Sequence, residues 1–262
     1  MDPSLRTAAS GMAAQQTRID VIANNLANVN TPGFKRSRAQ FEDLLYQTIE
    51  GEQDPNDPNA GSTSEIQIGR GTRLAGIQRV HEQGTFELTG RPMDLAINGE
   101  GLFQVRMPDD TIAYTRDGSF TISDQGIMVT SGGYPVIPDL QLTEDMREFT
   151  VSKQGVVSAN ITGQTDPVEI GRVELARFPN EPGLKAIGQN LWVETAASGD
   201  PILGVPQEDG FGRIDSGYLE SSNVEVVQEM VDMIAALRAY EINAKAVQAA
   251  EDMADVTNQL AQ

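Results

Sequence analysis

The stretch "LRTAASGMAAQQTRIDVIANNLANV", residues 5–29, places apolar side chains at the spacing of an α-helix that packs against other helices. Two series repeat every seven residues and are offset by three, which is the a and d pattern of a coiled coil over almost four heptads. The first series is Leu5, Met12, Ile19 and Leu26, and the second is Ala8, Gln15, Ile22 and Val29. The pattern predicts a long N-terminal helix that buries one stripe of side chains.

The C-terminal region, from about residue 222 to 260, shows a similar pattern. Its heptad series is Met230, Met233, Leu237, Tyr240, Ala244, Val247 and Ala254, interrupted by Glu251. A second apolar stripe follows Val224, Val227, Val231 and Ile234. Two stripes on one helix indicate more than one packing partner. Ser222 and Glu225 have the spacing of a capping box, which predicts that the helix begins there.

The two ends of the chain differ in charge. Residues 1–40 carry an excess of basic side chains, whereas residues 221–262 carry an excess of acidic ones. Opposite charges favour pairing of the two predicted helices, within one chain or between chains. Each exposed ion pair contributes only about 0.2–1 kcal/mol, so charge would bias the choice of partner rather than drive association.

Between the helices the sequence predicts a linker and a β domain. Residues 50–65, "EGEQDPNDPNAGSTSE", are acidic and nearly free of apolar side chains, which predicts a linker or a protrusion. The preceding "FEDLLYQTI" fits either a short helix or a strand. From 66 to 217, short apolar segments alternate with turn signals, as in an antiparallel barrel or sandwich. We expect an α+β fold with four parts: helix 1–34, linker 35–65, antiparallel β domain 66–217 and helix 218–262, the two helices forming a coiled-coil layer.

Composition argues against several classes of function. The formal net charge of −19 argues against nucleic acid as the main partner, because phosphate contacts need clustered Lys and Arg. The chain has no cysteine and one histidine, His81, so it lacks the ligands of a usual zinc site. Any Ser-His-Asp triad would have to use His81, which lies in "QRVHEQGTF" and is interpreted as a surface or strand-end histidine. We predict no catalytic residue, no metal and no cofactor.

The sequence shows no signal for a membrane. No run approaches 18 apolar residues, so we expect no transmembrane segment. The first 20 residues lack the basic and apolar regions of a cleaved secretory signal. The chain is therefore expected to stay in the cytoplasm or to leave by a route that needs no such signal.

The acidic pairs of the middle region leave one enzymatic alternative open. Asp109–Asp110, Glu144–Asp145 and Glu208–Asp209 lie in polar stretches and are interpreted as solvated turns. A glycosidase would need two carboxylates that face each other across a cleft. A β domain that binds or hydrolyses cell-wall polysaccharide therefore remains an alternative.

The terminal stripes allow two interpretations of their own. Amphipathic helices usually bury their apolar face within their own chain. Three features favour assembly between chains instead: small residues around Gly11 that permit close packing, polar residues such as Gln15 on the stripe, and adaptable methionines. The methionines are Met12, Met230 and Met233.

Several segments resemble one known family. "ANNLANVNTPGFKR" (23–36) resembles the N-terminal signature of the axial proteins of the bacterial flagellum, which are the rod, hook and hook-associated proteins. "GYLESSNVEVVQEMVDMIAALRAYEINAKAVQ" (217–248) is similar to the C-terminal signature of the same family. Similarity to the central β domain lies in "DLAINGEGLFQV" (94–105), "YTRDGSF" (114–120) and "NLWVETAASGDP" (190–201). Residues 38–49 and 66–84 look most like the distal rod member, with a proximal rod member of similar length as the rival.

The resemblance implies a structural protein rather than an enzyme. Members of the family polymerise helically into a hollow shaft across the periplasm and outer membrane, which passes torque from the motor to the hook and lets later export substrates through. Export by the flagellar type III apparatus fits the missing signal peptide. The implied partners are further copies of the chain, proximal rod proteins, hook protein, the rod cap, and the peptidoglycan and outer-membrane ring proteins.

The resemblance also implies where assembly takes place. The expected self-assembly interface comprises Leu5, Met12, Ile19, Ile22, Asn24, Asn25, Leu26, Asn28, Val29, Met230, Met233, Leu237, Tyr240 and Val247. In a tube, the asparagines at 24, 25 and 28 would face neighbouring subunits or a wet channel. The helix would then end in a type II turn over Thr31–Phe34, in which Pro32 fixes φ and Gly33 supplies a positive φ. Pro32, Gly33 and Phe34 are expected to act as a hinge, with Phe34 anchoring the chain where it leaves the turn.

Overall fold

The computed structural model describes residues 3–49, 66–141, 146–161 and 167–260. These residues fold as two compact units. The helix-hairpin unit contains Met1–Leu26, Ser37–Gln78 and Val226–Gln262, and the β-rich unit contains Ala27–Arg36 and Arg79–Glu225. The predicted linker at 50–65 lies outside the described residues.

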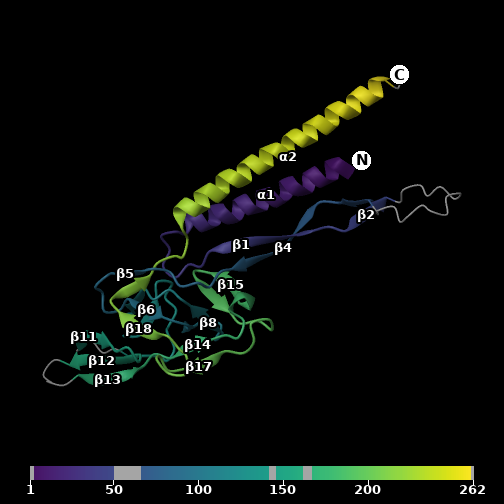
Figure 1. The fold of residues 1–262 in the computed structure, drawn as a ribbon. Helices are drawn as coiled ribbons and strands as arrows, with labels where there is room; N and C mark the ends of the chain where they lie inside the picture. Colours follow the sequence, from purple (N-terminus) through teal and green to yellow (C-terminus); the bar gives the residue numbers. More distant parts are fainter. Residues whose placement is uncertain (1–2, 50–65, 142–145, 162–166, 261–262) are drawn as a thin grey trace. The chain divides into compact units, whose positions relative to one another are not determined.

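Two long helices form one side of the helix-hairpin unit. The helices are α1 (Pro3–Ala27) and α2 (Val226–Leu260), which run antiparallel and side by side (Figure 1). Arg18 of α1 binds Asp232 of α2 at 3.0 Å. Nearer the N-terminus, a side chain at Gly11 would lie 3.0 Å from the amide nitrogen of Asn243. Gly11 therefore lets the helices approach each other inside one chain.

A two-stranded ribbon completes this unit. Its strands are β1 (Ser37–Asp43) paired with β4 (Thr72–Arg79), and β2 (Tyr46–Ile49) paired antiparallel with β3 (Ile66–Gly69). The stretch 41–49, which fitted a helix or a strand, is thus mainly strand. Residues 66–78 were predicted to start the β domain, but their pairing with β1 and β2 places them in the helix-hairpin unit.

Both helix ends differ from the prediction. Helix α1 ends at Ala27, because residues 28–30 form a turn in which the Thr31 N–H donates to the Asn28 carbonyl at 3.1 Å. Val29 therefore does not continue the helical seam. Helix α2 begins at Val226, so the predicted capping box at Ser222 is wrong. The Ser222 hydroxyl instead accepts the Val224 N–H at 3.3 Å, in a non-helical segment.

The β-rich unit is built from several small antiparallel sheets. The largest has the order β15 (Lys185–Gly188), β16 (Leu191–Val193), β8 (Ile112–Thr115), β7 (Leu102–Arg106), β14 (Leu175–Arg177), β17 (Ile202–Gly204). A second has the order β11 (Met146–Val151), β12 (Val156–Ile161), β13 (Val168–Arg172). Three pairs join β6 (Leu95–Asn98) to β18 (Arg213–Ser216), β5 (Phe86–Leu88) to β19 (Tyr218–Glu220) and β9 (Phe120–Ile122) to β10 (Met128–Thr130). A short 3₁₀ helix spans Glu181–Gly183.

The principal hydrophobic core lies in the β-rich unit. Phe103 and Phe120 are fully buried and meet edge to face, with ring centroids 5.1 Å apart. A second cluster contains Tyr114, Phe178 and Trp192. Its Tyr114 and Phe178 rings also meet edge to face, at 4.7 Å. The predicted α+β class with an antiparallel β region is confirmed.

Candidate functional site

Helix α2 leaves a large part of its apolar surface uncovered in the single chain. Its most buried side chains are small or polar: Glu229, Ala236 and Ala250. Val227 is 70% exposed and Val231 is 55% exposed. Among the side chains that the structure describes in α2, the other exposed large apolar ones are Val226, Met230, Ile234, Leu237, Tyr240, Ile242, Met253 and Val256. We call this set, with Val227 and Val231, the α2 apolar face.

The predicted interface residues are divided between covered and uncovered positions. Met230, Leu237 and Tyr240 lie on the α2 apolar face. Ile22 of α1 is buried within the chain. The half-buried members are Leu5, Met12, Ile19, Leu26, Asn28, Val29, Met233 and Val247, and Asn24 is exposed. Val224, from the second predicted stripe, is buried and precedes the helix.

Asn25 occupies a different place from the one predicted. Its amide is 1% exposed and is hydrogen-bonded inside the chain rather than presented to another subunit. It accepts the Ser37 N–H and donates to the Ser37 carbonyl, both at 2.8 Å, and it donates to Glu229 at 3.2 Å. Asn25 therefore joins α1, β1 and α2, which explains an amide so near the end of a helix.

The turn after α1 has the predicted form. The Phe34 N–H donates to the Thr31 carbonyl at 3.3 Å, and Gly33 has φ +68°. A Cβ atom at Gly33 would lie 2.6 Å from the Asp117 backbone nitrogen. The position therefore needs glycine for its conformation and for its contact with the β-rich unit.

A buried ionic cluster lies next to this turn. Glu220 accepts hydrogen bonds from the Lys35 ammonium and the Arg116 guanidinium, each at 2.6 Å, and from the Gly84 N–H at 2.9 Å. The Lys35, Arg116 and Glu220 side chains are 4%, 7% and 0% exposed. The remaining donors of Arg116 bind the carbonyls of Ile97, Gly99 and Gly101. We call Lys35, Arg116 and Glu220 the ionic cluster.

Charge pairing decides the protonation of this cluster. Burial raises the pKa of Glu220, but Arg116 and Lys35 outweigh burial and hold that pKa below its usual value. Burial lowers the pKa of Lys35, and Glu220 opposes that shift. A buried carboxylate with two cationic partners is satisfied only while all three groups are present.

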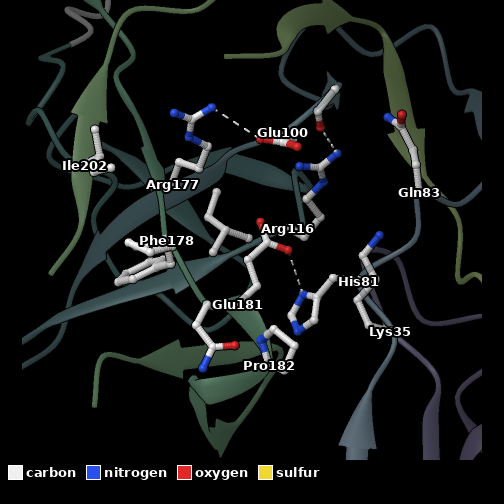
Figure 2. A pocket seen from close by; sticks show the side chains of 14 residues that line it. Lys35, His81, Gln83, Glu100, Arg116, Arg177, Phe178, Glu181, Pro182 and Ile202 are labelled. Carbon is white, nitrogen blue, oxygen red and sulfur yellow. Dashed lines mark hydrogen bonds and ion pairs between the residues drawn. The ribbon is translucent and has the colours of Figure 1, made fainter. Parts of the chain in front are cut away.

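The wall of a pocket includes part of the ionic cluster (Figure 2). The cavity has a volume of about 680 Å³ and lies within the β-rich unit. Its carboxylates are already engaged: Glu100 binds Arg177 at 3.3 Å, and Glu181 faces His81 at 3.4 Å. The remaining lining residues are Lys35, Gln83, Gly99, Leu102, Arg116, Phe178, Pro179, Asn180, Pro182 and Ile202.

His81 is a strand-end residue, as predicted, but its side chain is not on the surface. It follows β4 and is only 10% exposed, with its ring 5.7 Å from that of Trp192. Burial is the main cause that lowers the pKa of His81 to about 4, and the nearby cations Lys35, Arg79 and Arg116 lower it further. His81 is therefore neutral at pH 7.

His81 predicts an acid-sensitive fold. Because its folded pKa is about 4 and its ordinary value is 6.5, protonation favours the unfolded chain. Stability is complete above pH 6.5 and falls toward pH 4, by about 3 kcal/mol from this residue. His81→Gln should remove this part of the loss in urea unfolding measured at pH 7 and pH 4.5. The pKa of Glu181 is raised chiefly by burial, so protonation of Glu181 stabilises the folded chain and does not account for a loss in acid. Equal losses of stability in His81→Gln and in the unaltered protein would show that His81 contributes nothing.

The described residues contain no cluster of three or more His, Asp or Glu placed to hold a metal ion. In the same part of the chain, no helix is long and apolar enough to cross a membrane.

Family models match three parts of the chain. The model described as "Flagella basal body rod protein" matches residues 5–35. The "Flagellar hook protein FlgE/F/G D1 domain" matches 96–159, and the "Flagellar basal body rod FlgEFG protein C-terminal" matches 215–260. These models cover α1 with the turn, part of the β-rich unit, and α2.

Comparison with whole proteins decides which rod protein family the chain belongs to. The flagellar basal-body rod protein FlgG of Borreliella burgdorferi is 48% identical over 98% of both chains. FlgG of Caulobacter vibrioides is 49% identical over 98% of both chains, whereas FlgF of the same organism is 36% identical over 94% of this chain and 92% of its own. This chain belongs to the FlgG family of flagellar basal-body rod proteins. The prediction of a structural rod protein of the flagellar basal body is confirmed.

Local sequence patterns did not predict the polar side chains that pack beside the turn in this FlgG-family chain. Lys35, Arg116, Glu220 and Asn223 were not singled out, although each lies inside a motif that carries the family resemblance. The sequence signal that could have pointed to these four residues is a charged or amide side chain within an otherwise turn-like or apolar motif. Lys35 and Glu220 are 185 positions apart, so their pairing depends on the tertiary fold.

Proposed function

We propose that this chain is a subunit of the distal rod, polymerising with copies of itself into a hollow helical shaft that transmits torque from motor to hook and passes export substrates. The observation that carries this proposal is the α2 apolar face. Among the described side chains of α2, ten large apolar ones are at least 37% exposed, while the β-rich unit already has its own core. An exposed apolar surface of this extent is typical of a protein interaction site.

In the proposed polymer, α1 and α2 of neighbouring copies form the coiled-coil layer. Burial of apolar surface contributes roughly 25 cal/mol per Å², so the α2 apolar face would supply the main driving force. The exposed apolar side chains of the ribbon, among them Leu45 at 86% and Ile77 at 53%, add a second surface. Partly exposed ion pairs such as Arg18–Asp232, which joins α1 to α2 within one chain, contribute little to stability, so apolar burial rather than charge would hold neighbouring copies together.

The proposed partners follow from the same place in the flagellum. They are the proximal rod proteins, the hook protein, the rod cap, and the ring proteins of peptidoglycan and outer membrane. The chain would reach them through the flagellar type III apparatus. No nucleic-acid partner is proposed, because the net charge of −19 opposes phosphate binding.

Val231→Asp tests the α2 apolar face. Val231 is 55% exposed in the single chain, so the soluble protein should keep its melting temperature. In the polymer the new carboxylate would be buried without a partner, which costs about 3–5 kcal/mol and weakens subunit association at least a hundredfold. Sedimentation and motility of a complemented strain measure the effect. Gln248→Asp, which adds the same charge at an exposed polar position of α2, is the control and should assemble. Normal assembly of Val231→Asp would contradict the proposal.

The enzymatic alternative rests on the pocket beside the ionic cluster. Two carboxylates, Glu100 and Glu181, line it; Glu100 is paired with Arg177, and Glu181 lies 3.4 Å from His81, which is neutral at pH 7. We propose that the pocket has no catalytic role. The full chain should release no sugar from peptidoglycan, and turnover that Glu181→Gln abolishes would reverse this conclusion.

A further inference from the structure

The chain passes between its two units at four points. These lie after Leu26, Arg36, Gln78 and Glu225. Inside the β-rich unit, the residues next to these points belong to three short segments: 27–36, 79–84 and 220–225. We call them the connecting segments.

The Asn223 side chain joins all three connecting segments. Its oxygen accepts the Arg36 N–H at 2.8 Å, and its nitrogen donates to the carbonyls of Val80 and Glu82 at 2.9 and 3.0 Å. The Val80 N–H in turn donates to the Arg36 carbonyl at 2.9 Å. One amide therefore meets the backbone of both other segments close to the points where the chain leaves the unit.

Glu220 joins the same segments a few residues further in. Its carboxylate binds Lys35 of the first segment and the Gly84 N–H of the second, and its backbone carbonyl accepts the Gly33 N–H at 2.8 Å. Arg116, which also binds this carboxylate, donates to three carbonyls of the β-rich unit. Through Arg116, the connecting segments are joined to the core strands.

We propose that Asn223 and Glu220 are positioning residues for the rod, which fasten the three connecting segments to one another so that force passes through them as one body. This inference rests on the proposed function. A single extended segment bends and twists easily about its backbone dihedrals, whereas cross-linked segments do not. A subunit that transmits torque needs connecting segments that are cross-linked and therefore resist bending and twisting.

Amide hydrogen exchange on the full-length soluble chain tests the fastening directly. Asn223→Ala should speed exchange of the Arg36 N–H about tenfold, because that group loses its acceptor. Asn223→Asp keeps an acceptor and should restore the slow exchange. Asn180→Ala removes a comparable amide bond, from Asn180 to the Ala197 carbonyl within the β-rich unit, and should leave Arg36 unchanged. Exchange that rises equally in both Ala variants, or across the whole core, would contradict the proposal.

A second measurement examines polymers in electron micrographs. Asn223→Ala should still assemble, because the α2 apolar face is intact, but its rods should be curved where those of the unaltered protein and of Asn180→Ala are straight. Straight Asn223→Ala rods would overturn the inference while leaving the proposed function in place. If the unaltered protein forms no rods in any condition, the proposed function fails, and the exchange result still decides whether Asn223 fastens the segments.

Discussion

Glu220→Gln is expected to destabilise the β-rich unit by about 3–5 kcal/mol. Glutamine has nearly the same shape, but it leaves Lys35 and Arg116 buried without a negative partner. Both cations have lost most of their contact with water. When their negative partner is removed, no favourable interaction offsets the free-energy cost of that desolvation. Since typical domains are stable by only 5–15 kcal/mol, the variant should be close to unfolding at 37 °C.

Urea unfolding of the full chain at pH 7 measures this effect. Glu87→Gln, which changes an exposed carboxylate on the strand paired with β19, is the matched control and should lose less than about 0.5 kcal/mol. A loss below 1 kcal/mol in Glu220→Gln would contradict a charge-paired cluster.

The pH dependence of stability provides a second check on the ionic cluster. Because the folded pKa of Glu220 is lowered, its stabilisation is present above the ordinary carboxyl pKa and disappears as the pH falls through the folded value. Glu220→Gln should lack that part of the acid sensitivity.

Gly33→Val is expected to release the turn after α1 and to prevent rod assembly. Valine at φ +68° is strained, by about 1–2 kcal/mol or more for a β-branched side chain. Its Cβ would also lie 2.6 Å from the Asp117 nitrogen and 2.7 Å from the Arg116 carbonyl carbon. Both are backbone atoms, so no rotamer change relieves the contact. Residues 32–36 would have to move, which separates Lys35 from Glu220.

Gly90→Val separates the backbone strain of a valine at positive φ from the collision of its Cβ atom with neighbouring backbone atoms. Gly90 has φ +71°, but a Cβ there meets no atom within 4 Å, so this control carries the conformational strain without the collision. Thermal melting of the soluble proteins and motility of complemented strains are the measurements. Gly33→Val should lose clearly more stability than Gly90→Val, and only Gly33→Val should fail to assemble. Equal losses would show that the docking of the turn contributes little.

Local sequence signals predicted the elements that depend on local physics. The seven-residue spacing from Leu5 to Leu26 predicted α1, and Pro32 with Gly33 predicted the turn, because both follow from backbone geometry. The short run 41–49 remained ambiguous, since a few apolar residues fit a helix or a strand equally well. Its pairing with residues 66–79 settled it as strand.

The misplaced residues depend on contacts that are distant in sequence. Asn25 was expected on a subunit surface, but Ser37 and Glu229 bury it within the chain. His81 was interpreted as a surface or strand-end histidine; it follows a strand, but Trp192 and Glu181 lie against its side chain. No local pattern places such partners beside one another. The second stripe at Val224, Val227, Val231 and Ile234 was predicted from its helical spacing, as a sign of more than one packing partner. Val224 is buried, and the other three side chains are exposed in the single chain.

Electron cryomicroscopy of the assembled protein should show whether further copies of this chain cover the α2 apolar face in a tube. We expect a straight tube with a central channel, in which Val227, Val231 and Ile234 of α2 lie against helices of neighbouring copies. A chain that stays monomeric in every condition, or a polymer in which these side chains face solvent, would contradict this expectation.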